Sequence, residues 1–218
     1  MEQSNMTNVN HLMHGAHFAK SYVSNYLQND LPSRIIRYRN GWGISSTELP
    51  TPEKFFAYEP LALDAWPTVI TVAISTDNFE RMGFDGPDPL YRVNYSMRTY
   101  AWCRAVGPDE ATVARDRLTA VVRSALLDYP CLQAVDPRQS FQVMVDENSM
   151  REEFSDITLL KGDRVLAGGY VGYTLGINEV VTRQDISEIQ NIELAVSQQG
   201  LTDTNLSSST WNQIHTVG

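Results

Sequence analysis

The chain has 218 residues, 42% of them hydrophobic and 20% charged, and a formal net charge of −9. This composition is ordinary for a globular protein and argues against disorder along most of the length. No run approaches the ~20 consecutive apolar residues of a membrane helix, and Met1–Asn10 lacks the basic and apolar regions of a secretory signal. Because no Lys/Arg-rich block offsets the negative charge, a protein that holds DNA by its phosphates is also disfavoured.

The first third of the chain predicts one helix, one short strand and one long loop. Apolar residues at three- and four-residue steps indicate a helix over 7–29, and Asp30-Leu31-Pro32 is expected to end it. A strand is expected over 33–39. Gly and Pro interrupt residues 40–66, which are nevertheless too apolar for a free linker, so we expect a long loop that lies on the body.

Residues 67–75 form the next expected strand. Val69 and Ile70 lie on opposite faces of it, so we expect a central strand that is covered on both sides. The Gly- and Pro-containing segment 77–89 is expected to connect it to the following strand as a hairpin with an extended tip.

The segment from Leu90 to Tyr129 predicts a long strand, a tight turn and an amphipathic helix. From Tyr91 onward apolar and polar residues alternate, which is the pattern of a half-buried strand. Pro108 suits the first position of a helix, and the two acidic residues after it suit the positive end of the helix dipole. The apolar stripe of this helix is expected to include Ala114, Leu118, Val121, Val122, Ala125, Leu126 and Tyr129. The residues expected to lie away from the stripe are Arg115, Asp116, Thr119 and Arg123.

Three further strands are expected after this helix. They lie near 141–145, over 157–160 and over 165–181, with an acidic loop at 146–156 and a hairpin turn at 161–163. The last strand contains Gly168, Gly169, Gly172 and Gly176, which indicate bulges or close approach of another part of the chain.

This order of elements predicts an α+β fold. We expect a single mostly antiparallel sheet packed with an N-terminal helix and a central amphipathic helix, plus an extended C-terminal arm. Residues 1–181 are expected to form the domain, including the long loop 40–66. Residues 182–218 are rich in Gln, Ser, Asn and Thr and are expected to form the arm, with Trp211 as an anchor on a neighbouring subunit.

Two clusters have side chains suited to metal binding or catalysis, but not the required spacing. His11, His14 and His17 recur at three-residue steps, whereas the zinc-protease motif requires a four-residue step with a glutamate. The second cluster comprises Asp146, Glu147, Glu152, Glu153 and Asp156. It lacks the glycine that a calcium-binding loop requires at its sixth position. We therefore predict no catalytic residue, no metal and no cofactor, and retain a small metal-dependent hydrolase as the alternative from a different class.

Two other features have a structural interpretation that we favour. The glycines of Gly168-Gly169-Tyr170-Val171-Gly172 lie inside a strand pattern, whereas a dinucleotide-binding loop lies between a strand and a helix. We interpret Cys103 and Cys131 as two reduced buried thiols, and a disulfide between them stays an open alternative.

One patch combines basic and aromatic residues: Arg34, Arg37 and Arg39 with Tyr38 and Trp42. A nucleic-acid-binding module would use such a patch. In a chain of net charge −9 we instead expect it to pair with acidic residues of an adjacent subunit. The candidate subunit-interface residues are Arg98, Arg115, Asp116, Arg123 and Trp211.

Several runs in residues 65–180 resemble tail terminator proteins of long-tailed bacteriophages. They are Pro67-Thr68-Val69-Ile70-Thr71-Val72, Arg98-Thr99-Tyr100-Ala101-Trp102, Ala114-Arg115-Asp116-Arg117-Leu118 and Leu126-Leu127-Asp128-Tyr129-Pro130. The similarity lies in their order and spacing.

This resemblance implies a structural virion protein without enzymatic activity, assembled in the host cytoplasm and located in the neck of the tail. Such proteins form a ring, a hexamer in this family, on the head-proximal end of the tail tube. The implied partners are other copies of the chain, the tail tube protein and a head-closure or connector protein. DNA would only pass through the lumen, and no membrane is involved. A head–tail connector or a tail tube subunit is the alternative within this class.

Overall fold

The computed structural model describes residues 15–85, 88–128, 132, 143–154, 158–160 and 164–181, and the account below is confined to them. The predicted arm, with Trp211, lies outside these residues, as do His11, His14, Cys131 and the turn at 161–163. The described part confirms the α+β fold, with an N-terminal helix, a central helix and a mostly antiparallel sheet. Neither helix is both long and apolar enough to cross a membrane.

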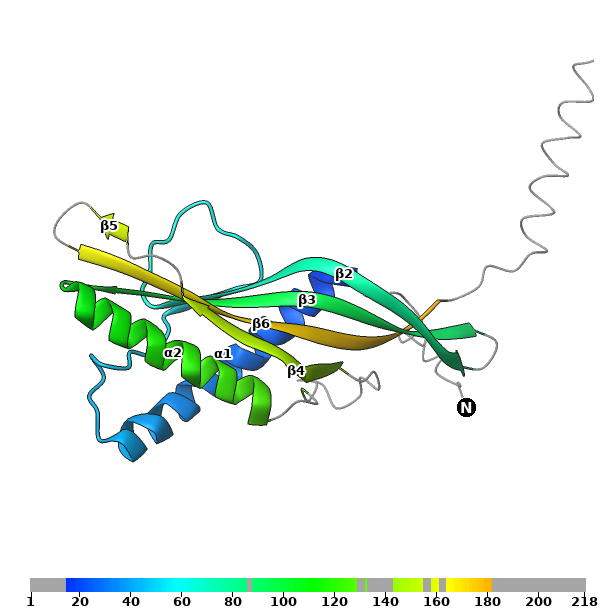
Figure 1. Cartoon of the computed structure of the whole chain (residues 1–218), viewed down its shortest axis with the longest axis horizontal. Helices are drawn as coiled ribbons and strands as arrows, with labels where there is room; N and C mark the ends of the chain where they lie inside the picture. Colours follow the sequence, from blue (N-terminus) through cyan, green and yellow to red (C-terminus); the bar gives the residue numbers. More distant parts are fainter. Residues whose placement is uncertain are drawn as a thin grey trace, which may run out of the picture. The chain divides into compact units, whose positions relative to one another are not determined.

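The sheet has the strand order β1-β2-β3-β6-β4, and β5 also pairs with β6. β1 runs parallel to β2, and the other pairs are antiparallel. Both helices lie on the same side of the sheet (Figure 1). In chain order the elements are α1 (Gly15–Trp42), β1 (Lys54–Phe56), β2 (Thr68–Asp85), β3 (Asp88–Ala105), α2 (Pro108–Asp128), β4 (Val143–Phe154), β5 (Thr158–Leu160) and β6 (Arg164–Val180).

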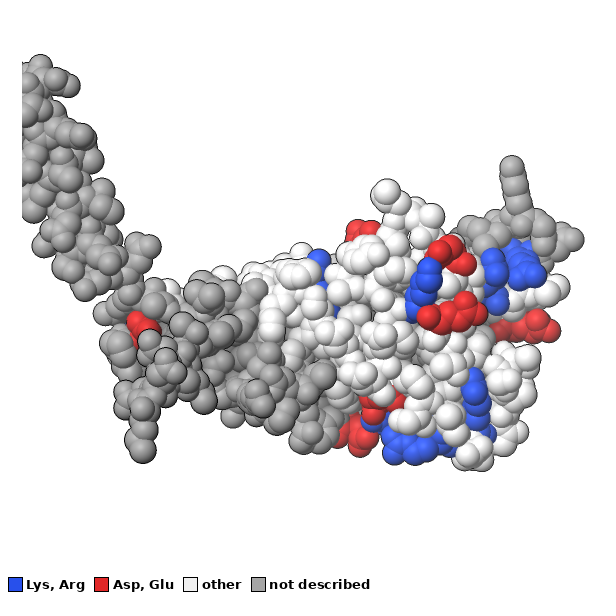
Figure 2. Space-filling model, turned by 180° about the vertical axis from the view of Figure 1, so that it is seen from behind, with Lys and Arg blue, Asp and Glu red and all other residues white. Residues whose placement is uncertain are grey.

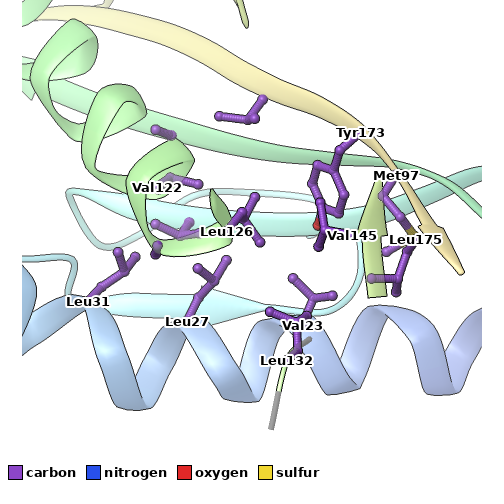
Figure 3. Close-up of a cluster of buried hydrophobic side chains, with 14 of the residues drawn as sticks. Val23, Leu27, Leu31, Met97, Val122, Leu126, Leu132, Val145, Tyr173 and Leu175 are labelled. Carbon is purple, nitrogen blue, oxygen red and sulfur yellow. The ribbon is translucent and has the colours of Figure 1, made fainter. Parts of the chain in front are cut away.

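β3 and β6 form the centre of the sheet and carry its most regular pairing, from Leu90↔Val180 to Ala105↔Val165. Alternate residues of β3 from Val93 to Cys103 are buried, which confirms the predicted half-buried strand. The buried side chains of β3 and β6 meet those of both helices in one core (Figure 3). Labelled members of this core are Val23, Leu27 and Leu31 of α1, Val122 and Leu126 of α2, and Met97, Tyr173 and Leu175 of the sheet.

The N-terminal helix is longer than predicted, and the predicted strand over 33–39 is wrong. α1 continues through Pro32 to Trp42 because its buried stripe continues across the proline, with Leu31 and Ile35 fully buried. A proline inside a helix costs about 3 kcal/mol, and burial of two large apolar side chains offsets a cost of this size. The helix ends where Gly43 adopts a left-handed φ of 66° and Ile44 N donates to Arg39 O over 3.1 Å.

The predicted hairpin between 67–75 and the long strand is confirmed, but its strands are longer than expected. β2 and β3 remain paired from Thr68↔Trp102 to Asp85↔Asp88, so most of segment 77–89 is strand and not loop. The burial of both faces over 68–72 is confirmed. β2 is also an interior strand of the sheet, since over Thr68–Ile70 it pairs with β1 on one side and with β3 on the other.

Two expectations about local structure need correction. In the predicted acidic loop, residues up to 154 belong to β4, because after an irregularity at 147–150 the strand pairs again with β6 at Arg151↔Gly172. On α2, Arg115 and Thr119 are buried and not turned away. Thr119 packs closely against β6 because residue 169 is a glycine. A Cβ added at Gly169 would lie only 3.2 Å from Thr119 Oγ1.

Candidate assembly surfaces

The distal half of the β2–β3 hairpin exposes an apolar surface. Beyond Ala73 the side chains of Ile74, Phe79, Met82 and Phe84 are 48%, 56%, 47% and 56% exposed. In Figure 1 this part of the hairpin extends beyond both helices, so the helices that bury the proximal half do not cover it. Four large exposed apolar side chains on one projecting element make it a candidate for protein–protein contacts.

The outer backbone edge of β2 is irregular. Among the described strands only β1 pairs with this edge, over Thr68–Ile70. The pairing of β2 with β3 shifts register at three places, between Ala73 and Ser75, Thr76 and Asn78, and Arg81 and Gly83. Bulges bend a strand and make its edge a poor template for another strand. Contacts at the distal hairpin are therefore expected to be made by side chains.

A groove of about 790 Å³ lies at the other end of the sheet, beside the first turn of α2. Its walls are the segment after α1, the residues just before β2, the end of β3, the start of α2 and the first residue of β6. Lining residues include Glu48, Trp66, Pro67, Asp109, Glu110 and Val113. The groove thus combines apolar walls with charged side chains of both signs, since Arg104 and Arg164 line it as well.

One wall of this groove is held by an ion pair. Glu48 Oε1 accepts from Arg117 Nη1 of α2 over 3.0 Å. The Ser45 N–H also donates to the Glu48 carboxylate, over 3.0 Å. The Ser45 backbone bond first and Arg117 second lower the pKa of Glu48 to about 2. The bond to Arg117 holds the segment after α1 against α2.

The sheet face opposite the helices carries Arg98, one of the predicted interface residues. Its guanidinium lies 4.7 Å from the centre of the Tyr170 ring, and Tyr100 and Tyr170 are cross-strand neighbours with ring centres 5.1 Å apart. A hydrogen bond with Tyr100 raises the pKa of Arg98. The position of Arg98 on an open face leaves it accessible to another molecule, but its nearest neighbours are aromatic residues of its own chain.

The three predicted interface residues of α2 make contacts within the chain. Arg115 is buried, lies over the Phe154 ring at 5.0 Å, and donates through Nε to Asp116 Oδ1 over 2.8 Å. Arg123 Nη1 pairs with Glu152 Oε2 of β4 over 2.8 Å. The structure therefore uses these side chains to attach α2 to β4. Their role between subunits stays a prediction, as does that of Trp211, which lies outside the described residues.

The basic and aromatic patch of α1 joins the two helices. Arg34 is only 5% exposed and donates to Asp30 Oδ2 over 2.5 Å and to Asp128 Oδ2 over 2.8 Å. Burial alone would lower the pKa of Arg34, but the bonds to both carboxylates outweigh it and raise the pKa. Tyr38 Oη adds a 2.6 Å bond to Ser124 Oγ. The expected pairing of Arg34 with an adjacent subunit is thus wrong, because acids of its own chain already occupy the guanidinium.

The described residues contain no group of three or more His, Cys, Asp or Glu side chains placed to hold a metal ion. Cys103 is buried as a free thiol, and burial raises its pKa to about 12. On the face shown in Figure 2, one group of basic side chains lies among acidic ones, and a second group follows the lower edge with acidic side chains at one end of it.

No protein-family model and no curated protein matches this chain. The evidence on function therefore comes from the surfaces described above.

The exposed hairpin residues and the groove were not among the sites predicted from the sequence. Phe79, Met82 and Phe84 fall in a segment rich in Gly, Pro and Asp, which indicated a connecting loop. Three large apolar residues within such a segment were the signal that could have identified a contact surface. The groove joins segments as far apart as Glu48, Trp66 and Glu110, and no local pattern shows that juxtaposition.

Proposed function

We propose that this chain is a structural virion protein of a long-tailed bacteriophage. It forms a ring on the head-proximal end of the tail tube, ends tube growth, and joins the tail to a head-closure or connector protein. The observation that carries this proposal is the hairpin that extends beyond the helices and exposes Ile74, Phe79, Met82 and Phe84. A subunit with such a surface is suited to contact other subunits through a projecting element.

Two further observations support a structural role. The runs that resemble tail terminators occupy the framework of the fold: residues 98–102 lie in β3 at the sheet centre, and residues 114–118 lie in α2. The net charge of −9 also suits a passage through which DNA moves, because a negative wall repels the phosphates. In this proposal the partners are copies of the chain, the tail tube protein and the head-closure protein.

Addition of the full-length protein to growing tail tubes tests the proposal directly. Tube protein alone is expected to form tubes of variable length, and addition of this chain is expected to stop their growth. Electron micrographs should then show one ring on one end of each tube. A head–tail connector would leave tube length unchanged, and a tube subunit would lengthen the tubes or stack without limit. Either result would contradict the proposed terminator function.

A further inference from the structure

We infer that the sheet face opposite the helices binds single-stranded nucleic acid. The binding surface is formed by Arg98, Tyr100, Trp102 and Arg104 of β3 and Tyr170 of β6, which we call the arginine–aromatic strip. The inference goes beyond the proposed function and is independent of it, because neither ring formation nor the end of tube growth requires a nucleic acid on this face.

The pairing of the two central strands places the members of the strip side by side. Arg98, Tyr100 and Trp102 lie opposite Gly172, Tyr170 and Gly168. The residues between them on β3 point into the core, and both helices lie on that other side of the sheet (Figure 1). Arg104 is exposed, and the other four members are half-buried. Their guanidinium groups and rings are therefore accessible from the open side.

The strip is positive although the chain as a whole is negative. On this face β6, and the part of β3 that pairs with it, carry no carboxylate and four arginines: Arg92, Arg98, Arg104 and Arg164. The acidic residues of the same face lie on the distal hairpin and on β4, and they are Glu80, Asp88, Asp146 and Glu153. The net charge of −9 is thus an average that does not describe the centre of this face.

Two groups of acids mark the limits of the strip. Glu153 borders it on β4, but its carboxylate already pairs with Arg151 Nε over 3.1 Å. At the Ala105 end, Asp109 and Glu110 line the groove that Arg104 also lines. The positive surface therefore ends at the first turn of α2, and we place the bound strand between these limits.

Three aromatic rings of the strip are held in place by the sheet. The ring centres of Tyr100 and Tyr170 are 5.1 Å apart, and the Arg98 guanidinium lies 4.7 Å from the centre of the Tyr170 ring. The six-membered ring of Trp102 lies across Gly168, because its atoms are the nearest to a Cβ added there. Aromatic rings stack on unpaired bases, and arginine neutralises phosphate and adds cation–π attraction.

The width of the strip favours one strand over a duplex. On β2 the same face is buried at Ile70 and Val72, so the accessible surface spans about two strands, or about 10 Å. The bases of a single strand are also free to stack on protein rings, whereas those of a duplex stack on each other. An acidic peptide would satisfy the arginines but would leave the three rings without flat partners.

Fluorescence anisotropy with the full-length chain and a labelled oligothymidylate of about 20 nucleotides tests the inference. This probe is longer than the ~4–16 nucleotides that comparable sheet-based sites cover. We expect a Kd of about 1–100 μM at about 50 mM salt. If three arginines contact phosphates, log K falls with log salt with a slope of about −2, so binding should weaken about 20-fold by about 200 mM salt.

Two variants separate the roles of charge and stacking. Arg98→Gln should weaken binding and reduce the magnitude of the salt slope by about 0.7, because one phosphate contact is lost. Tyr170→Ala should weaken binding about tenfold and leave the slope unchanged, because it removes a stacked ring and no charge. Arg104→Gln, at an exposed position, repeats the charge test independently. Circular dichroism verifies that each variant is folded.

The matched controls are Arg37→Gln and Phe79→Ala. Arg37 is an exposed arginine of α1, and Phe79 is a 56% exposed aromatic residue of the distal hairpin, so neither belongs to the strip. Both controls should bind the probe as tightly as the wild type does.

Four results would overturn the inference. They are no binding by the wild type at the lowest salt, wild-type affinity in the folded strip variants, equal weakening in the controls, and equally tight binding of a duplex of the same length. Displacement of the probe by polyglutamate as effectively as by unlabelled oligothymidylate would also overturn it, because the face would then recognise negative charge alone. None of these results bears on the tube-growth assay, so the proposed function is tested separately.

Discussion

Replacement of Gly168 by alanine tests how closely β6 is packed on the open face of the sheet. A Cβ added at Gly168 would meet the ring of Trp102 most closely at Cζ3 and would lie 2.6 Å from both Cε3 and Cη2, at least 0.8 Å closer than the 3.4 Å at which ordinary contact begins. Gly168 is not among the glycines with positive φ, so alanine meets no backbone strain there. The indole ring of Trp102 must therefore move.

The magnitude follows from two opposing effects. Overpacking typically costs about 1–3 kcal/mol, and alanine in place of glycine recovers about 0.4–1 kcal/mol by restricting the unfolded chain. We expect Gly168→Ala to lower the free energy of unfolding by about 1–2 kcal/mol. For a chain of this size each 1 kcal/mol corresponds to about 2–4 °C in Tm.

Gly172→Ala is the matched control on the same strand and face. An added Cβ there would meet Arg151 Nε at 3.2 Å and Cγ at 3.3 Å, and Arg151 is an exposed side chain that can move aside. We expect this variant to be as stable as the wild type or slightly more stable. Unfolding in urea, followed by circular dichroism, measures both, and Trp102→Ala should remove the cost of Gly168→Ala. Equal stability of the two glycine variants, or no rescue by Trp102→Ala, would refute the packing argument.

Three further predictions follow from the contacts described above. In a Cys131→Ser background, Cys103 should not react with a thiol reagent at pH 8 while the protein is folded, because burial raises its pKa to about 12. The same thiol should react fully in denaturant, and rapid reaction of the folded protein would contradict the prediction. Arg34→Ala should lower the free energy of unfolding by about 2 kcal/mol, because it leaves Asp30 and Asp128 without their cation, whereas Arg37→Ala at an exposed position should change it by less than about 0.5 kcal/mol in the same urea titration. Since the pKa of Glu48 is lowered from 4.5 to about 2, its contribution to stability should be complete above pH 4.5 and lost as the pH falls toward 2. A side-chain NMR titration measures the pKa of Glu48 directly. The variant Arg117→Ala should raise that pKa.

The regular elements were predictable where a local pattern agreed with the final packing. β3 and α2 were identified from the alternation after Tyr91 and from Pro108 with its acidic neighbours, because each buries one face against a single layer. The N-terminal helix was identified as well, but its continuation past Asp30 was not, because Pro32 is a strong helix-breaking signal locally, and only the core that receives Leu31 and Ile35 shows why the helix continues.

The surfaces were less predictable than the fold for a related reason. The burial of Arg115 depends on the Phe154 ring, and that of Thr119 on the missing side chain of Gly169, and both lie on strands remote in sequence. The distal hairpin extends through a Gly- and Pro-containing segment because a regular β3 offers it a pairing partner. Propensity describes a segment alone, whereas these features depend on what lies beside it.

The three register shifts of β2 bear on how copies of this chain behave at high concentration. Between shifts, the longest stretch of the distal strand in step with its partner is Asn78–Arg81, four residues. Fibril growth needs straight segments of about six residues that stack repeatedly. Copies of this chain can therefore expose apolar side chains on the distal hairpin at high concentration without stacking into fibrils, because no distal stretch of β2 is long and regular enough to stack.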